Sequence, residues 1–292
     1  MMHRDQLPVD EELVARLLRA QHPELAQLPV TRLDSSGTVN AMFRLGDELV
    51  VRMPYVAPAD GPAEADLLTR LWPKLSTPIP RVVATGSPDD EYPSHWLVLG
   101  WLPGRPPTPG SGSRELAAEL LTFLEELRAV DLPGAPPTYR SALTPLNEQV
   151  LECLEQSRAL LDPVEFSALE LCWRDALAAT AWDGPTVWTH GDLLPANVLV
   201  NDAGHLTAVL DFGAAGPRDP ACDLMGVWSL LTPQAQQFAH ERHGLGEDAW
   251  RRARGWALSQ AIIALPYYVD TNPGMVAVAR QALSQLSRTY PR

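Results

Sequence analysis

Two carboxylates and one carboxamide stand close together in the sequence, at Asp192, Asn197 and Asp211. Asn197 and Asp211 flank a predicted β-hairpin, in which the apolar runs 198–200 and 206–210 are separated by turn residues. Because antiparallel pairing brings the open ends of a hairpin together, we expect these three side chains to lie near one another. Such hard oxygen ligands suit Mg²⁺, which keeps several waters and shares its shell with substrate phosphates.

The spacing of these residues reproduces two motifs of kinases. His190-x-Asp192, followed after four residues by Asn197, matches the catalytic-loop pattern H-x-D-x-x-x-x-N, and residues 211–213 match the metal-binding D-F-G. Each motif alone occurs by chance in many chains, whereas two in order, joined by a hairpin, form a strong signal. The alternative is an ordinary hairpin whose aspartates are turn residues.

The whole stretch resembles the aminoglycoside phosphotransferase family, small-molecule kinases with a protein-kinase-like fold. Those enzymes carry H-G-D-x-x-x-x-N, an aspartate at the D-F-G position and then D-P-x-x-D-L, and all three are present here. The resemblance implies that Asp192 accepts or orients the proton of the substrate hydroxyl, and that His190 shapes its loop. It also implies that Asn197 and Asp211 hold Mg²⁺.

The D-P-x-x-D-L motif at residues 219–224 contains two further acidic residues. Asp219 is placed to cap a helix that begins near Ala221. By the resemblance, Asp223 points back to fix the backbone of the catalytic loop, and a plain helix aspartate is the alternative.

Composition limits the class of protein. The chain of 292 residues, 46% of them hydrophobic, is long enough for one large lobe or two fused lobes. Its formal net charge of −13 argues against nucleic acid as a partner. No apolar run approaches membrane-spanning length, and the acidic N-terminal stretch does not match a secretory signal, so we expect a cytoplasmic protein. Three cysteines without C-x-x-C spacing predict free thiols.

The first part of the chain reads as a small antiparallel sheet with one inserted helix. A helix capped by Asp10 comes first, and a second helix follows Gly61. Strands are predicted at residues 30–35, 41–45, 48–53, 78–86 and 94–102. A Pro/Gly/Ser-rich segment then begins at residue 103, which places the boundary between the two lobes at Leu102.

The second part of the chain is mainly helical. Helical patterns run over residues 117–127, 145–161, 163–182, 221–231, 233–243, 247–265 and 273–290. The predicted fold is therefore α+β and bilobal, like that of protein kinases. Residues 1–102 form the nucleotide-binding lobe, and residues 103–292 form the catalytic and acceptor-binding lobe.

A kinase of this type needs a cation on a strand of its small lobe to hold nucleotide phosphates. The single lysine, Lys74, stands between prolines and away from any predicted strand. Arg52 lies within a strand, and Glu64 lies on the apolar stripe of the following helix. By the resemblance, Arg52 is the strand cation, in place of the usual lysine, and Glu64 is the glutamate that pairs with it. An exposed strand arginine with a boundary glutamate is the alternative.

Two other segments are candidates for nucleotide contact. Ser36 and Thr38 lie in a loop between strands where a kinase covers the phosphates, although an ordinary hairpin turn is about as probable. By the resemblance, the segment from Leu99 to Leu102 is the hinge that faces the nucleotide base, and a surface loop after an edge strand is the alternative. The sequence does not choose between ATP and GTP as donor.

The charge and the aromatic content of the C-terminal residues indicate which kind of acceptor the enzyme uses. Residues 218–292, which wall the acceptor site in this fold, carry eight basic and six acidic side chains. They also carry Trp228, Trp250, Trp256, Tyr267 and Tyr268, which at helical spacing are more often core than ligand platform. We therefore predict an acceptor of low positive charge, or a macrolide-like one, over a polycationic aminoglycoside. Most histidines outside the motif are expected to be solvated.

The sequence predicts a Mg²⁺-dependent phosphotransferase that moves the γ-phosphate of a nucleotide to a hydroxyl of a small molecule. The acceptor is expected to be an antibiotic, with a role in antibiotic resistance. One alternative is a metabolite kinase of the same fold, acting on an amino alcohol, a sugar or a glycated amine. The other is a non-catalytic nucleotide-binding module, against which the retention of Asp192, Asn197 and Asp211 argues.

Overall fold

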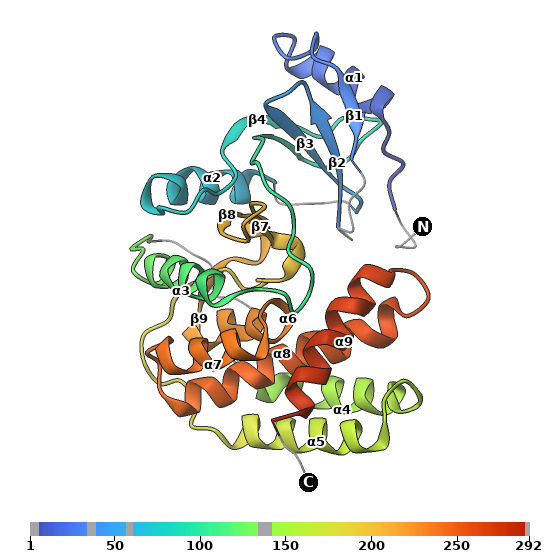
Figure 1. Cartoon of the computed structure of the whole chain (residues 1–292). Helices are drawn as coiled ribbons and strands as arrows, with labels where there is room; N and C mark the ends of the chain where they lie inside the picture. The colour runs from blue at the N-terminus through green and yellow to red at the C-terminus, as the bar shows by residue number, and fades with distance from the viewer. Residues whose placement is uncertain (1–5, 34–38, 57–60, 134–141, 290–292) are drawn as a thin grey trace. The chain divides into compact units, whose positions relative to one another are not determined.

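The computed structural model describes residues 6–33, 39–56, 61–133 and 142–289 (Figure 1). The chain divides into two compact units, Met1–Pro103 and Gly104–Arg292. None of the helices in the described ranges is long and apolar enough to cross a membrane.

The N-terminal unit is built on one antiparallel sheet of strand order β1-β2-β3-β5-β4. Its strands are β1 (Val30–Arg32), β2 (Asn40–Leu45), β3 (Leu49–Pro54), β4 (Val82–Gly86) and β5 (Trp96–Gly100). Its helices are α1 (Glu11–Gln21), α2 (Gly61–Leu71) and the short 3-10 helix η1 (Trp72–Lys74). The predicted small antiparallel sheet with one inserted helix is confirmed, since α2 lies between β3 and β4 in the chain.

Strand β3 lies inside the sheet, between β2 and β5, and its side chains are buried on both faces. Val51 and Met53 point into the apolar core that α1 also covers, and neither is exposed to solvent. Arg52 points to the opposite face, as strand alternation requires, and meets Glu64 of α2. As predicted, Asp10 caps α1, accepting a hydrogen bond from the backbone N–H of Leu13 at 2.9 Å.

The C-terminal unit is mainly helical. Its α-helices are α3 (Arg114–Arg128), α4 (Asn147–Gln156), α5 (Pro163–Ala178), α6 (Gly226–Leu230), α7 (Pro233–Arg242), α8 (Glu247–Tyr268) and α9 (Pro273–Ser287). Its 3-10 helices are η2 (Thr144–Leu146), η3 (Arg158–Leu160), η4 (Pro195–Asn197), η5 (Phe212–Ala214) and η6 (Pro220–Met225). Two strand pairs complete it, the hairpin β7 (Val198–Val200) with β8 (Leu206–Val209), and β6 (Val187–Thr189) with β9 (Gly216–Arg218). The predicted hairpin is confirmed.

The predicted helix at residues 221–231 is wrong in its first half, which forms the tighter 3-10 helix η6 before the short α6. Pro220 begins η6, and the Asp219 side chain caps it through the N–H of Ala221 at 3.0 Å, as expected. Gly226 is the first residue of α6 and lies very close to the backbone of Leu193. A Cβ added to Gly226 would lie 2.3 Å from the carbonyl oxygen of Leu193. This close packing holds the segment in place.

Helix α8 is the central helix of the C-terminal unit, and it packs against α4, α5, α6, α9 and η6. It continues beyond the predicted end at residue 265, through Pro266 to Tyr268. Most of its residues from Ala249 to Ala261 are buried. Any side chain that α8 directs toward another element is therefore held on a rigid support.

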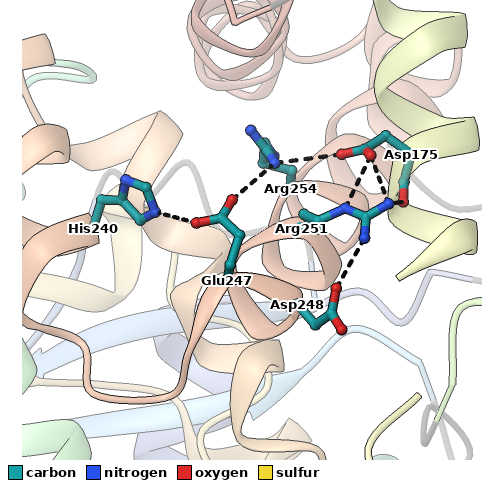
Figure 2. Close-up of polar contacts among 6 residues, drawn as sticks. All are labelled: Asp175, His240, Glu247, Asp248, Arg251 and Arg254. Carbon is teal, nitrogen blue, oxygen red and sulfur yellow. Dashed lines mark hydrogen bonds and ion pairs between the residues drawn. The ribbon is translucent and has the colours of Figure 1, made fainter. Parts of the chain in front are cut away.

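Ion pairs join the first turns of α8 to its neighbours (Figure 2). Asp175 of α5 lies 2.7 Å from Arg251 and 3.4 Å from Arg254. Arg254 also lies 3.7 Å from Glu247, which in turn contacts His240 of α7 at 2.8 Å. Isolated ion pairs at the surface contribute little to stability. A connected network of ion pairs fixes the relative positions of α5, α7 and α8 more effectively than single pairs would.

His243 is buried at the end of α7, where its ring stacks on Trp250 at a centroid distance of 5.3 Å. The expectation of a solvated side chain is wrong for this histidine, because helix spacing alone does not show that α8 covers it. Burial lowers its pKa to about 4, and the neighbouring His240 adds to this effect. His243 is therefore uncharged at neutral pH.

We expect His243 to make the folded protein less stable at acid pH. Between about pH 6.5 and pH 4 the unfolded chain binds a proton at His243 that the folded chain does not, so stability falls as pH falls through this window. The loss at this position amounts to about 3 kcal/mol. Urea unfolding at pH 7 and pH 4.5 should show a smaller pH dependence in a His243→Gln variant. Equal pH dependence in the two proteins would contradict the assignment.

Candidate active site

The loop that carries Asp192 is fixed through its backbone by Asp223. The buried Asp223 carboxylate accepts hydrogen bonds from the N–H groups of His190 at 2.9 Å and Gly191 at 2.8 Å. The expectation that Asp223 points back to this loop is confirmed. Gly191 has a φ of +79°, and an added Cβ would lie 2.7 Å from the carbonyl oxygen of Ala214, so glycine is required here.

His190 joins the loop to the residue that precedes Asp211. Its Nε2 lies 2.8 Å from the carbonyl oxygen of Leu210, and its Nδ1 accepts the N–H of Asp192 at 3.3 Å. These two partners place the ring proton on Nε2. The fully buried ring also meets Phe212 edge-on at a centroid distance of 4.8 Å. His190 therefore shapes the loop and does not point to solvent.

Both oxygens of the Asp192 carboxylate accept hydrogen bonds from side-chain amides. Asn197 donates to Oδ2 at 3.0 Å and to the Asp192 carbonyl oxygen at 2.8 Å. Gln260 of α8 donates to Oδ1 at 2.5 Å. No sequence motif includes Gln260, which stands 68 positions after Asp192, in the apolar second half of α8.

Burial raises the pKa of the Asp192 carboxyl above its ordinary value. The negative charge of Asp211 adds to this rise. The amide donors of Gln260 and Asn197 lower the pKa, because they favour the ionised carboxylate. A carboxylate of raised pKa is a better proton acceptor than one in water.

Asn197 and Asp211 lie at the same open end of the hairpin, as predicted. The N–H of Leu210 donates to the carbonyl oxygen of Asn197 at 2.8 Å, which sets Asp211 one residue beyond this bond. Asp211 has the left-handed backbone angles φ 59° and ψ 78°, a conformation in which aspartate and asparagine are enriched. Its Oδ1 accepts the N–H of Gly213 at 3.3 Å.

The chemistry of this pair fits Mg²⁺. The amide nitrogen of Asn197 is turned to Asp192, which leaves its carbonyl oxygen as the atom suited to a metal. One carboxylate and one amide oxygen match an ion that takes one or two protein ligands and fills its shell with water and substrate phosphates. The other carboxylate, Asp192, is occupied by two amide donors.

In the N-terminal unit, Arg52 and Glu64 form the predicted ion pair between β3 and α2. The two side chains are only 10% and 14% exposed, so the pair is largely desolvated. Leu99 is buried in β5, where it is paired with Val50 of β3, and Leu102 is half-buried after the strand. The candidate phosphate-binding residues Ser36 and Thr38 lie outside the described residues.

An apolar pocket adjoins the residue that holds Asp192. Gln260 forms part of its wall, and the pocket is small, with a volume of about 20 Å³. The other lining residues are Leu194, Met225, Ser229, Ala257, Ala261, Ala264, Met275, Val278, Ala279 and Ala282. None of these described lining residues is charged. By contrast, the three tryptophans considered as ligand platforms, Trp228, Trp250 and Trp256, are buried core residues.

The cysteines are free thiols, as predicted: Cys172 and Cys222 are buried, and Cys153 is half-buried. Burial raises the pKa of both Cys172 and Cys222 to about 12, so these thiols are unreactive at neutral pH.

The model of the phosphotransferase enzyme family matches residues 30–256, which include both Arg52 and the complete catalytic segment. The chain belongs to this family. It is accordingly a small-molecule phosphotransferase, and the resemblance seen in its motifs is confirmed. A search of curated proteins found no match.

Solved structures show the same kinase-like fold, as the sequence predicted. The GDP complex of aminoglycoside 2'-phosphotransferase-IIIa is similar with a TM-score of 0.72 at 19% identity, over 96% of this chain and 99% of that one. Macrolide 2'-phosphotransferase type I gives 0.62 at 18% identity, over 96% and 98%. Macrolide 2'-phosphotransferase MphH from Brachybacterium faecium gives 0.58 at 24% identity, over 96% and 99%. The phosphotransferase family is therefore established, and the acceptor has to be inferred from the site.

Proposed function

We propose that this enzyme transfers the γ-phosphate of a nucleoside triphosphate to a hydroxyl of an antibiotic that presents apolar surface, as a macrolide does. The observation that carries the proposal is the Asp192 carboxylate, held at both oxygens by amides, one of which belongs to the wall of an uncharged pocket. Such a reaction would inactivate the antibiotic, and we expect it to occur in the cytoplasm.

Phosphoryl transfer asks little covalent chemistry of the protein, so positioning and charge neutralisation carry most of the catalysis. Asp192 would accept or orient the proton of the acceptor hydroxyl, and His190 would hold its loop. Asn197 and Asp211 would bind Mg²⁺, which neutralises phosphate charge when it is present.

The donor would be ATP or GTP. The solved relatives include GDP and ADP complexes, which supports a nucleotide as the donor for this chain. Arg52 would grip its phosphates and Glu64 would orient Arg52. Ser36 and Thr38 would cover the phosphates, and the segment from Leu99 to Leu102 would face the base.

The lining of the pocket favours an acceptor of low positive charge. A polycationic aminoglycoside needs carboxylates to replace its hydration, and none of the described residues that line the pocket supplies one. The small side chains of Ala257, Ala261 and Ala264 instead form an apolar wall along α8. With a volume of about 20 Å³ the pocket is far smaller than a whole ligand site, so it would take at most one small apolar group of a larger acceptor.

We expect macrolide-like acceptors to be phosphorylated with a higher kcat/KM than kanamycin-like ones. Both should be assayed with ATP and with GTP, beside a panel of hydroxylated metabolites, at low and high salt. Efficient turnover of a polycation that falls steeply with salt would contradict the acceptor assignment, because salt screens charge attraction. Turnover of metabolites alone would favour the alternative of a metabolite kinase.

Replacing Asp211 by Asn should weaken the binding of the Mg²⁺-nucleotide complex. Asparagine tolerates the left-handed backbone at this position, whereas alanine would add strain, so the Asn variant isolates the carboxylate. Titration calorimetry with and without Mg²⁺ should show a loss of about tenfold or more in affinity, from the loss of an interaction of a charged group. Wild-type affinity in the presence of Mg²⁺ would remove Asp211 from the proposed metal site.

A further inference from the structure

We propose that Gln260 is a positioning residue that orients the Asp192 carboxylate. The inference rests on the proposed function, because it assigns the role of Gln260 relative to Asp192 as the base. It concerns a residue that none of the sequence motifs contains.

The geometry restricts rotation of the carboxylate. Gln260 donates to Oδ1 at 2.5 Å, and Asn197 donates to Oδ2 at 3.0 Å. Two donors on the two oxygens fix the plane of the carboxylate, whereas one donor would allow it to swing about its Cβ–Cγ bond. Hydrogen bonds to a charged acceptor are also stronger than those between neutral groups. Asn197 is assigned to the metal, so Gln260 is the donor dedicated to Asp192.

The support of Gln260 is rigid. Two turns earlier in α8, the buried Arg252 makes two hydrogen bonds to Asp219, at 2.6 and 3.1 Å, and one to the carbonyl oxygen of Thr180 at 2.6 Å. Asp219 caps η6, the segment whose Asp223 holds the backbone of the catalytic loop. Helix α8 is thus tied to that loop by two routes, one through Arg252 and η6 and one directly through Gln260.

Gln260 lies beside an apolar surface of α8. Its amide reaches Asp192, while the residue itself lines the small pocket beside Ala257, Ala261 and Ala264. With a volume of about 20 Å³ this pocket leaves the side chain little room to move, so Gln260 is held in place next to the carboxylate.

Gln260→Leu keeps similar bulk and removes the amide. Loss of one hydrogen bond to a charged group predicts a fall in kcat of about 10- to 100-fold. Gln260→Glu keeps the shape but places a carboxylate, which is an acceptor, where the amide donor stood, so its kcat should fall at least as far. The KM for nucleotide should stay near that of the wild type in both variants.

Gln236→Leu provides a matched control. Gln236 is also a half-buried helical glutamine of the C-terminal unit, and its Nε2 donates to the carbonyl oxygen of Leu231 at 2.9 Å. The control loses one amide hydrogen bond without touching Asp192, so its kcat should stay near that of the wild type. Thermal unfolding of all three variants checks that each one is folded. If Gln260→Leu is unstable, Gln260→Glu, which is closest in shape to the wild type, still tests the inference.

The outcomes separate this inference from the proposed function. If Asp192→Asn abolishes turnover while both Gln260 variants keep the wild-type kcat, the positioning role is wrong and the proposed function stands. An equal fall in kcat in Gln260→Leu and in the control Gln236→Leu would likewise overturn the role, because it would show a packing effect alone. Wild-type turnover in Asp192→Asn would overturn the assignment of the base, and the inference with it.

Discussion

Asp192→Asn should lower kcat by about 10²- to 10⁴-fold, which is the range of general-base contributions. The substitution keeps the size of the side chain but removes the charge that accepts the proton. It also presents an amide nitrogen to Gln260 and Asn197, both of which donate to Asp192 in the wild type. The loss should fall on kcat, with nucleotide affinity nearly unchanged, because the carboxylate is not assigned to the metal.

Steady-state kinetics with the best acceptor, together with nucleotide binding measured by calorimetry, would check this result. Asp202→Asn is a suitable control, since Asp202 is a fully exposed aspartate in the turn of the same hairpin. It should behave as the wild type in both measurements. Unaltered turnover in Asp192→Asn would remove this residue as the base, and a parallel loss of nucleotide affinity would point to a metal ligand instead.

Glu64→Ala should cost about 3–5 kcal/mol of stability, the range for removing one partner of a buried ion pair. The substitution removes this carboxylate from an Arg52 guanidinium that is only 10% exposed. Affinity for Mg²⁺-nucleotide should fall as well, because the cation proposed to grip the phosphates loses the group that orients it. Urea unfolding and nucleotide titration measure the two effects separately.

Asp66→Ala offers a control in the same helix. Asp66 pairs with Arg70 at 3.2 Å, but this pair is exposed, and exposed pairs contribute about 0–1 kcal/mol. Arg52→Lys then distinguishes charge from shape: a mild effect means that charge suffices, whereas a severe one means that the planar guanidinium is used. If Glu64→Ala leaves stability and nucleotide affinity unchanged, the pair has neither role.

Residue spacing and periodicity predicted the contacts that are made within one structural element or between elements adjacent in the chain. Residue type and spacing placed Asp192, Asn197 and Asp211 at the open end of one hairpin, and helical periodicity turned Glu64 toward Arg52. In both cases the geometry of one or two neighbouring elements decides where the side chains lie. These contacts span 5 to 20 positions of sequence, a range in which strand and helix periods remain reliable.

Such local patterns could not predict contacts that depend on tertiary packing. Gln260 meets Asp192 only because α8 packs against η6, and Arg252 secures that packing through Asp219. His243 is buried only because Trp250 of α8 lies against it. The strand pair β6 and β9 is also non-local, since its two three-residue strands are too short to show an alternating pattern.

The arginine at position 52 also determines how the enzyme can be labelled chemically. A guanidinium stays protonated in proteins and is a poor nucleophile, so amine-acylating nucleotide probes would find no reactive amine at this strand position. The single lysine, Lys74, ends η1 and is exposed. Amine-directed dyes would therefore modify one side chain, on the N-terminal unit, and leave Arg52 and its glutamate intact. Lys74 is thus a natural side-chain position for a fluorescent reporter, without any engineered cysteine, and labelling has to be distinguished only from reaction at the α-amine of the chain.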